Sequence, residues 1–104
     1  MLERRLTDVA HRLKQLGEDL RIADEQLRHF VDEADDARLR ATVSEAPVAQ
    51  REQREAQRHA DAMARHRQDL TEEIARLERT QDELLDRLLE TMDPPPMDRA
   101  VDQP

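Results

Sequence analysis

The stretch 42-TVSEAPV-48 decides how this chain folds, because it separates two long runs of helix-favouring residues. Pro47 cannot continue an incoming helix, but it suits the first turn of a new one. Ser44 is a candidate N-cap for that second helix, since its hydroxyl can accept a backbone N–H. We therefore expect the chain to reverse direction within residues 42–48.

Apolar residues on both sides of this turn follow the spacing of a coiled coil. In the first arm, about residues 2–41, they recur at alternating intervals of four and three, which is typical of a heptad seam. The second arm, about residues 48–92, repeats the pattern with interruptions at Gln53, Arg67 and Gln81. The seam consists of Leu2, Leu6, Val9, Leu13, Leu16, Leu20, Ala23, Leu27, Phe30, Ala34, Ala37 and Ala41, and then Ala49, Gln53, Ala56, Ala60, Met63, Arg67, Leu70, Ile74, Leu77, Gln81, Leu84 and Leu88.

One register fits both arms if they are antiparallel. Facing seam residues then have numbers that add to 90, so Leu13 faces Leu77 and Leu20 faces Leu70. We predict an all-α fold, a two-helix antiparallel coiled-coil hairpin over residues 1–92, and two such hairpins can pair into a four-helix bundle. Leucine fills the end near the termini, called the base, and alanine fills the end near the turn, called the tip. Residues 93–104 begin with Asp-Pro-Pro-Pro, and we expect them to form a disordered tail.

Composition limits the classes of function. Hydrophobic residues make up 37% of the 104 residues and charged residues 40%, which favours an elongated helical protein over a globular domain. The sequence has no cysteine, no run long enough to span a bilayer and no apolar leader at its start, so we expect a cytoplasmic protein without a membrane partner. A formal net charge of -8 argues against nucleic acid as a partner.

No pattern of a catalytic, metal or cofactor site is present. No two of the four histidines are three or four residues apart, as a metal site on one helix requires. The acidic run at 32–36 lacks the glycine-turned loop of a calcium site, and there is no glycine-rich phosphate loop. We therefore expect a non-enzymatic protein without cofactor or metal, in which the hairpin is a spacer and docking surface for other proteins.

The sequence offers two kinds of candidate interaction residue: apolar residues just outside the seam and an arginine within it. Leu85, Leu89 and Met92 lie just outside it at the base, where a lone hairpin leaves them partly exposed and pairing of two hairpins would cover them. We therefore predict a homodimer that forms through the base. Arg67 faces Ala23, and the aliphatic stem of the arginine can pack over the alanine while the guanidinium reaches Asp24. Alternatively, this polar seam residue specifies the register of the two helices. In a third interpretation, the guanidinium binds a carboxylate of a partner protein.

The topology suggests an alternative function. A long hairpin with a carboxylate at its turn resembles the coiled-coil arm of Gre-type transcription factors. That arm enters the secondary channel of RNA polymerase and presents carboxylates at its tip to the active-site magnesium. Glu45 is the residue of the turn that the resemblance would place in this role.

Overall fold

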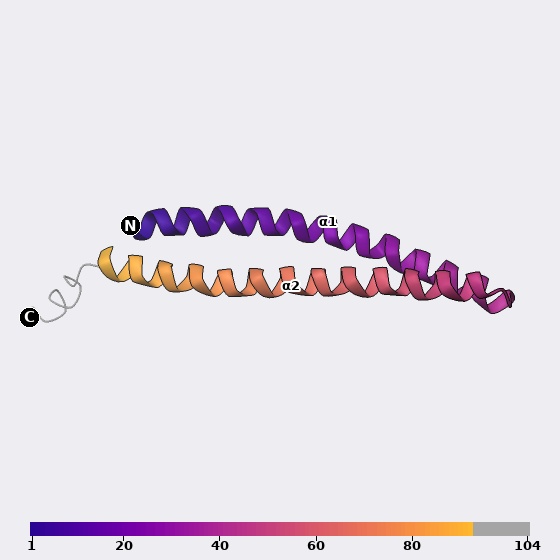
Figure 1. Cartoon of the computed structure of the whole chain (residues 1–104). Helices are drawn as coiled ribbons and strands as arrows, with labels where there is room; N and C mark the ends of the chain where they lie inside the picture. Colours follow the sequence, from indigo (N-terminus) through magenta and orange to yellow (C-terminus); the bar gives the residue numbers. More distant parts are fainter. Residues whose placement is uncertain (93–104) are drawn as a thin grey trace, which may run out of the picture.

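The structure is a computed structural model, and it describes residues 1–92. Helix α1 (Leu2–Val43) has 42 residues and helix α2 (Pro47–Met92) has 46, and the two run antiparallel (Figure 1). At ~1.5 Å per residue they are about 63 and 69 Å long. Residues 1–92 contain no strand, so the predicted all-α hairpin is confirmed. The tail predicted at 93–104 lies outside the described residues.

Ser44, Glu45 and Ala46 form the link between the helices. The backbone N–H of Ser44 donates to the carbonyl oxygen of Arg40 at 3.0 Å and closes the last turn of α1. Ser44 is therefore the C-cap of α1, and its prediction as an N-cap of the second helix is wrong. Its Oγ instead accepts a hydrogen bond from the backbone N–H of Ala46 at 3.2 Å, which holds the short link in place.

The reversal is tighter than the predicted stretch at 42–48. Val43 still belongs to α1, and α2 begins directly at Pro47. Proline is favourable at the first helical position because the N–H that it lacks would have no partner there. Ala46 takes the position before the helix, and its carbonyl oxygen accepts from the backbone N–H of Ala49 at 3.1 Å. The serine is thus two residues too early to cap α2.

The predicted seam is the buried interior of the rod. Every seam residue identified from the sequence is buried or half-buried, including the three polar ones in α2. A cluster centred on Leu16, Ala23 and Leu70 packs with further seam residues of both helices, as the register requires. The other members of this cluster are Leu20, Met63, Ile74 and Leu77. Near the tip the buried residues are alanines, so that end buries less apolar surface.

An ion pair between the helices identifies one flank of the seam. Arg12 Nη2 lies 3.1 Å from Glu73 Oε2, and each residue directly precedes a seam residue, Leu13 or Ile74. Residues at seven-residue intervals from this pair lie on the same side, since seven residues make almost two helical turns. We call this side the Arg12 flank. It consists of Arg5, Arg12, Asp19, Gln26, Glu33 and Arg40 in α1, and Glu52, His59, His66, Glu73, Thr80 and Arg87 in α2.

The opposite side, called the Leu85 flank, carries residues that directly follow seam residues such as Leu16 and Leu84. It consists of Glu3, Ala10, Gly17, Asp24, Val31 and Arg38 in α1, and Gln50, Gln57, Ala64, Thr71, Glu78, Leu85 and Met92 in α2. The two flanks differ in chemistry. The Arg12 flank is polar throughout, whereas the Leu85 flank is less charged and carries small and apolar residues.

Candidate interaction surfaces

The base exposes the three apolar residues that the sequence singles out. Leu85 directly follows the buried Leu84, and this one-residue offset turns its side chain out of the seam. Leu85 is 42% exposed, Leu89 61% and Met92 66%, so their predicted exposure in a single hairpin is confirmed. Spacings of four and three residues place them on one face of α2, where they form a continuous apolar patch, called the base patch.

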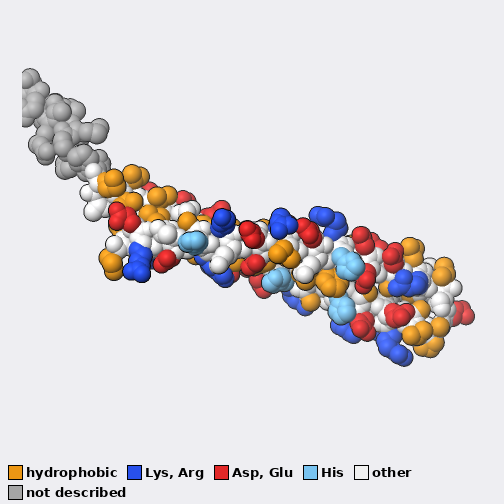
Figure 2. All heavy atoms as spheres, turned by 90° about the horizontal axis from the view of Figure 1, so that it is seen from above, with side chains coloured by type: hydrophobic (Ala, Val, Ile, Leu, Met, Phe, Trp, Pro, Cys, Tyr) orange, Lys and Arg blue, Asp and Glu red, His pale blue; other side chains and the backbone are white. Residues whose placement is uncertain are grey.

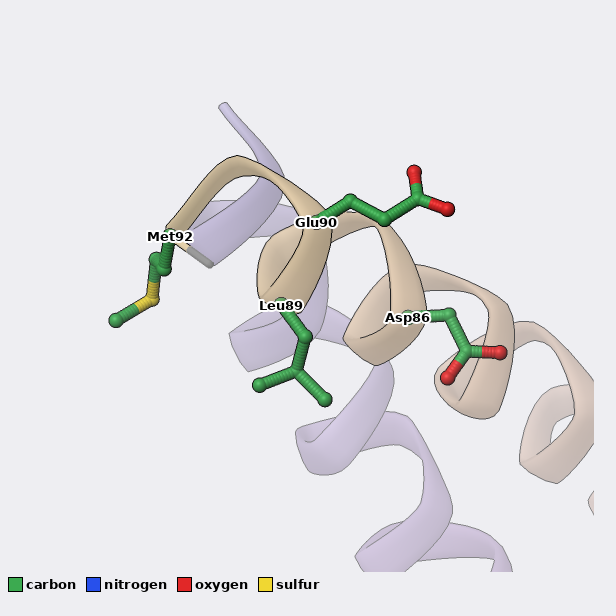
Figure 3. Close-up of a pocket in the computed structure, with 4 residues that line it drawn as sticks. All are labelled: Asp86, Leu89, Glu90 and Met92. Atoms are coloured by element: carbon green, nitrogen blue, oxygen red, sulfur yellow. The ribbon is translucent and has the colours of Figure 1, made fainter. Parts of the chain in front are cut away.

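Acidic residues border the base patch but point away from it. Asp86, Leu89, Glu90 and Met92 line a surface pocket at the end of α2. In Figure 3 the side chains of Leu89 and Met92 extend to one side of the helix, and the carboxylates of Asp86 and Glu90 extend to another. The apolar side of this helix end is therefore exposed, with the two carboxylates at its border.

Arg67 occupies a half-buried seam position about midway along α2. Its Nε donates to Oδ1 of Asp24 on α1, so the expected reach to this carboxylate is confirmed. The small Ala23, which is fully buried, leaves room for the aliphatic part of the arginine. The guanidinium thus has an intramolecular partner, and its binding of a carboxylate on another protein stays a prediction.

Glu45 lies at the far end of the rod from the base patch, exposed in the link between the helices. The structure therefore does not bring the five predicted interaction residues together. Leu85, Leu89 and Met92 share the base, whereas Arg67 and Glu45 lie progressively farther along the rod. They cannot form one site.

The tip carries a second group of exposed apolar residues, which the sequence reasoning missed. Leu39 is 65% exposed, Val43 85% and Val48 about half, and we call them the tip patch. The base patch is thus one of two exposed apolar groups at the ends of the rod. The reason is that Ala41 and Ala49 fill the seam here, so valines one or two residues away face outward. Their offset from the heptad was the signal that could have identified them.

Charged side chains of both signs cover the rod between its two ends. Figure 2 shows acidic and basic groups interleaved along its length, with hydrophobic side chains gathered near each end. Within residues 1–92 no group of three or more His, Cys, Asp or Glu is arranged to hold a metal ion. Neither described helix has an apolar segment long enough to cross a membrane.

The fold defines the class of protein: an intramolecular antiparallel coiled coil with apolar patches at its two ends. Comparison with protein-family models, with curated proteins and with solved structures found no match.

Proposed function

We propose that this chain is a non-enzymatic coiled-coil scaffold in the cytoplasm, which dimerises through its base and presents its tip to a protein partner. The observation that carries the proposal is the exposure of apolar side chains at both ends of a charged rod. Covering such side chains is favourable by roughly 25 cal/mol per Å² of apolar area removed from water. The rod holds the two patches about 60 Å apart, which suits a spacer.

The non-enzymatic part of the proposal rests on the shape of the rod. Enzyme sites are concave and exclude water around the reacting groups. In residues 1–92, two helices form one seam and no second layer, and the buried side chains of that seam are all alanine or leucine. A rod of this kind offers surface for docking and little enclosed volume for chemistry.

A pull-down with matched variants tests the partner. The replacement of Val43 and Val48 by glutamate places two charges in the tip patch without touching the seam. Ile22→Glu is the control, since Ile22 is also exposed, 44%, but lies in the middle part of the rod. We expect the wild type and the control to capture the same protein and the tip variant to lose it. Capture that is unchanged in the tip variant would contradict docking at the tip.

Dimerisation has its own test. Replacement of both Leu85 and Leu89 by glutamate should convert a dimer to a monomer in sedimentation, with helicity by circular dichroism unchanged. Each Leu→Ala change at these positions should cost less than the ~2–5 kcal/mol of a fully buried leucine, because both are partly exposed. A wild-type chain that is monomeric at concentrations of about 50 µM would contradict the homodimer.

The Gre-like alternative rests on the exposure of Glu45 at the end of the hairpin. The neighbouring Val43 and Val48 make this tip mainly apolar, and Asp35 and Asp36 lie about two helical turns or more before the end of α1. Transcript cleavage by stalled RNA polymerase would test this function. Cleavage that the wild type stimulates and Glu45→Ala abolishes would favour the alternative over the scaffold.

A further inference from the structure

The Leu85 flank differs from the Arg12 flank in a way that a single hairpin does not explain. A two-helix rod exposes both flanks to water equally, so both should be charged for solubility. The Arg12 flank is polar at every position, whereas Val31, Leu85 and Met92 on the other flank are exposed apolar side chains. The next helical position adds Leu89, because it lies four residues after Leu85 on the same side. Ile22, Val43 and Val48 are exposed beside the Arg12 flank in the same way, but only the Leu85 flank carries exposed apolar side chains at the positions next to the seam.

We propose that the occupant of this flank is a second copy of the chain, with the two-fold axis parallel to the rod, so that the bases lie together in a four-helix bundle. This inference rests on the proposed scaffold function and adds the surface and the orientation of the dimer. In this arrangement α1 of each copy lies beside α2 of the other copy, and the two helices are antiparallel. Along the rod, their residues are aligned as they are within one hairpin, where facing residues have numbers that add to about 90. Both base patches then meet at one end.

Charges beside the flank match in this orientation. These residues form an outer line, each four residues after a member of the Leu85 flank. The outer line consists of Thr7, Lys14, Arg21, Arg28, Asp35 and Thr42 in α1, and Arg54, Asp61, Gln68, Ala75, Asp82 and Leu89 in α2. With this alignment along the rod, Arg28 faces Asp61 of the second copy, and Asp35 faces Arg54 of the second copy. The remaining positions bring no two like charges together.

The reversed orientation, with each base against the other copy's tip, does not match. A two-fold axis across the rod would place α1 beside α1 of the second copy. In the outer line of α1, Arg21 would then face Arg28 twice by symmetry, and Lys14 would face Asp35 twice. The reversed orientation thus sets two repulsive pairs against two attractive ones, whereas the orientation with the bases together has four attractive pairs and no repulsive pair in the outer line. Charge complementarity therefore selects the orientation with the bases together.

The acidic residues of the base are divided between the two sides of the rod, since Glu3 and Glu78 belong to the Leu85 flank and Asp82 to the outer line. Glu83 and Glu90 lie four and three residues from Arg87, so they border the Arg12 flank on the other side of the rod. Figure 3 shows Glu90 pointing away from Leu89, in agreement with this placement. Asp24 and Arg67, whose ion pair lies on the covered side, enter the interface as a pair of opposite charges. Repulsion from Glu83 and Glu90 is thus directed away from the contact, whereas Glu3, Glu78 and Asp82 lie beside it.

Disulfide cross-linking tests the orientation in a chain that has no cysteine of its own. The double variant Arg28→Cys with Asp61→Cys should yield a covalent dimer on mild oxidation, because each position faces the other residue of the second copy. Arg28→Cys alone should stay monomeric on a non-reducing gel, since the two α1 helices lie diagonally opposite. The double variant Lys14→Cys with Asp35→Cys reports the reversed orientation. A covalent dimer from this second pair, without one from the first, would overturn the proposal.

Charge reversal tests the same contact without oxidation. Arg28→Asp should raise the dimer dissociation constant about tenfold, because it turns two attractive pairs into repulsive ones. Asp61→Arg should do the same, and the combined variant should return the constant toward the wild-type value. Losses that add in the combined variant, or a wild type that sediments as a monomer at about 50 µM, would overturn the proposal. Partner capture that still depends on Val43 and Val48 in such a monomer would leave docking at the tip intact, so failure of the dimer and failure of the docking are distinguishable.

Discussion

Arg67 of α2 donates a hydrogen bond from Nε to the carboxylate of Asp24 on α1, beside the buried Ala23. Both partners are about 40% exposed, so water screens the pair and its contribution to stability is modest. A double-mutant cycle of Asp24→Ala and Arg67→Ala should give a coupling of about 0.2–1 kcal/mol in urea unfolding. The coupling should decrease at about 1 M salt. Effects of the two single variants that simply add would show that the contact contributes no stability.

The register predicts which residues can be cross-linked within one chain. Cysteines in place of Leu13 and Leu77 should form a disulfide efficiently, because these seam residues face each other. Cysteines in place of Leu13 and Leu27 should not, since both lie on α1, four turns apart. Gel mobility under non-reducing conditions distinguishes the products. Cross-linking of the first pair only between chains would replace the hairpin with a domain-swapped or parallel dimer.

Stability should be uneven along the rod. The cluster of Leu16, Leu70 and their neighbours buries more apolar surface than the alanines of the tip. Amide hydrogen exchange should therefore be slowest at residues 13–20 and 70–77 and fast at 34–60. Mass spectrometry of exchanged peptides can measure this difference. A tip protected as well as the base would indicate that a partner or another subunit covers it.

Gly17 is an exposed glycine in the interior of α1, and an added Cβ would meet no heavy atom within 4 Å. Gly17→Ala should therefore stabilise the monomer by about 0.5–1 kcal/mol, since glycine is unfavourable within a helix. The reverse substitution at Ala10, which is exposed on the same flank, should destabilise it by a similar amount. Thermal unfolding of dilute protein measures both. A gain for Gly17→Ala that disappears at dimer-forming concentrations would indicate close approach of a second copy there.

The seam and the register could be predicted from sequence because the coiled-coil period is local and regular. Leu16 and Leu84 are the largest fully buried side chains, and both belong to the predicted seam. The details of the turn could not be predicted as well. Ser44 could end the first helix or begin the second, and the two cases differ by only two or three residues in the helix boundaries. Helix propensities do not define boundaries to that precision.

The sequence by itself determined that this chain forms an antiparallel helical hairpin, because the heptad spacing and Pro47 act through local sterics and the burial of one apolar stripe. Only the tertiary structure showed the second exposed apolar group, at the tip. Val43 and Val48 lie two residues and one residue from the seam alanines Ala41 and Ala49, and a rotation of about 100° per residue turns them outward. The ion pair of Arg67 with Asp24 likewise depends on the side of the seam toward which the arginine extends. Such choices follow from packing between the two helices, which no single helix encodes.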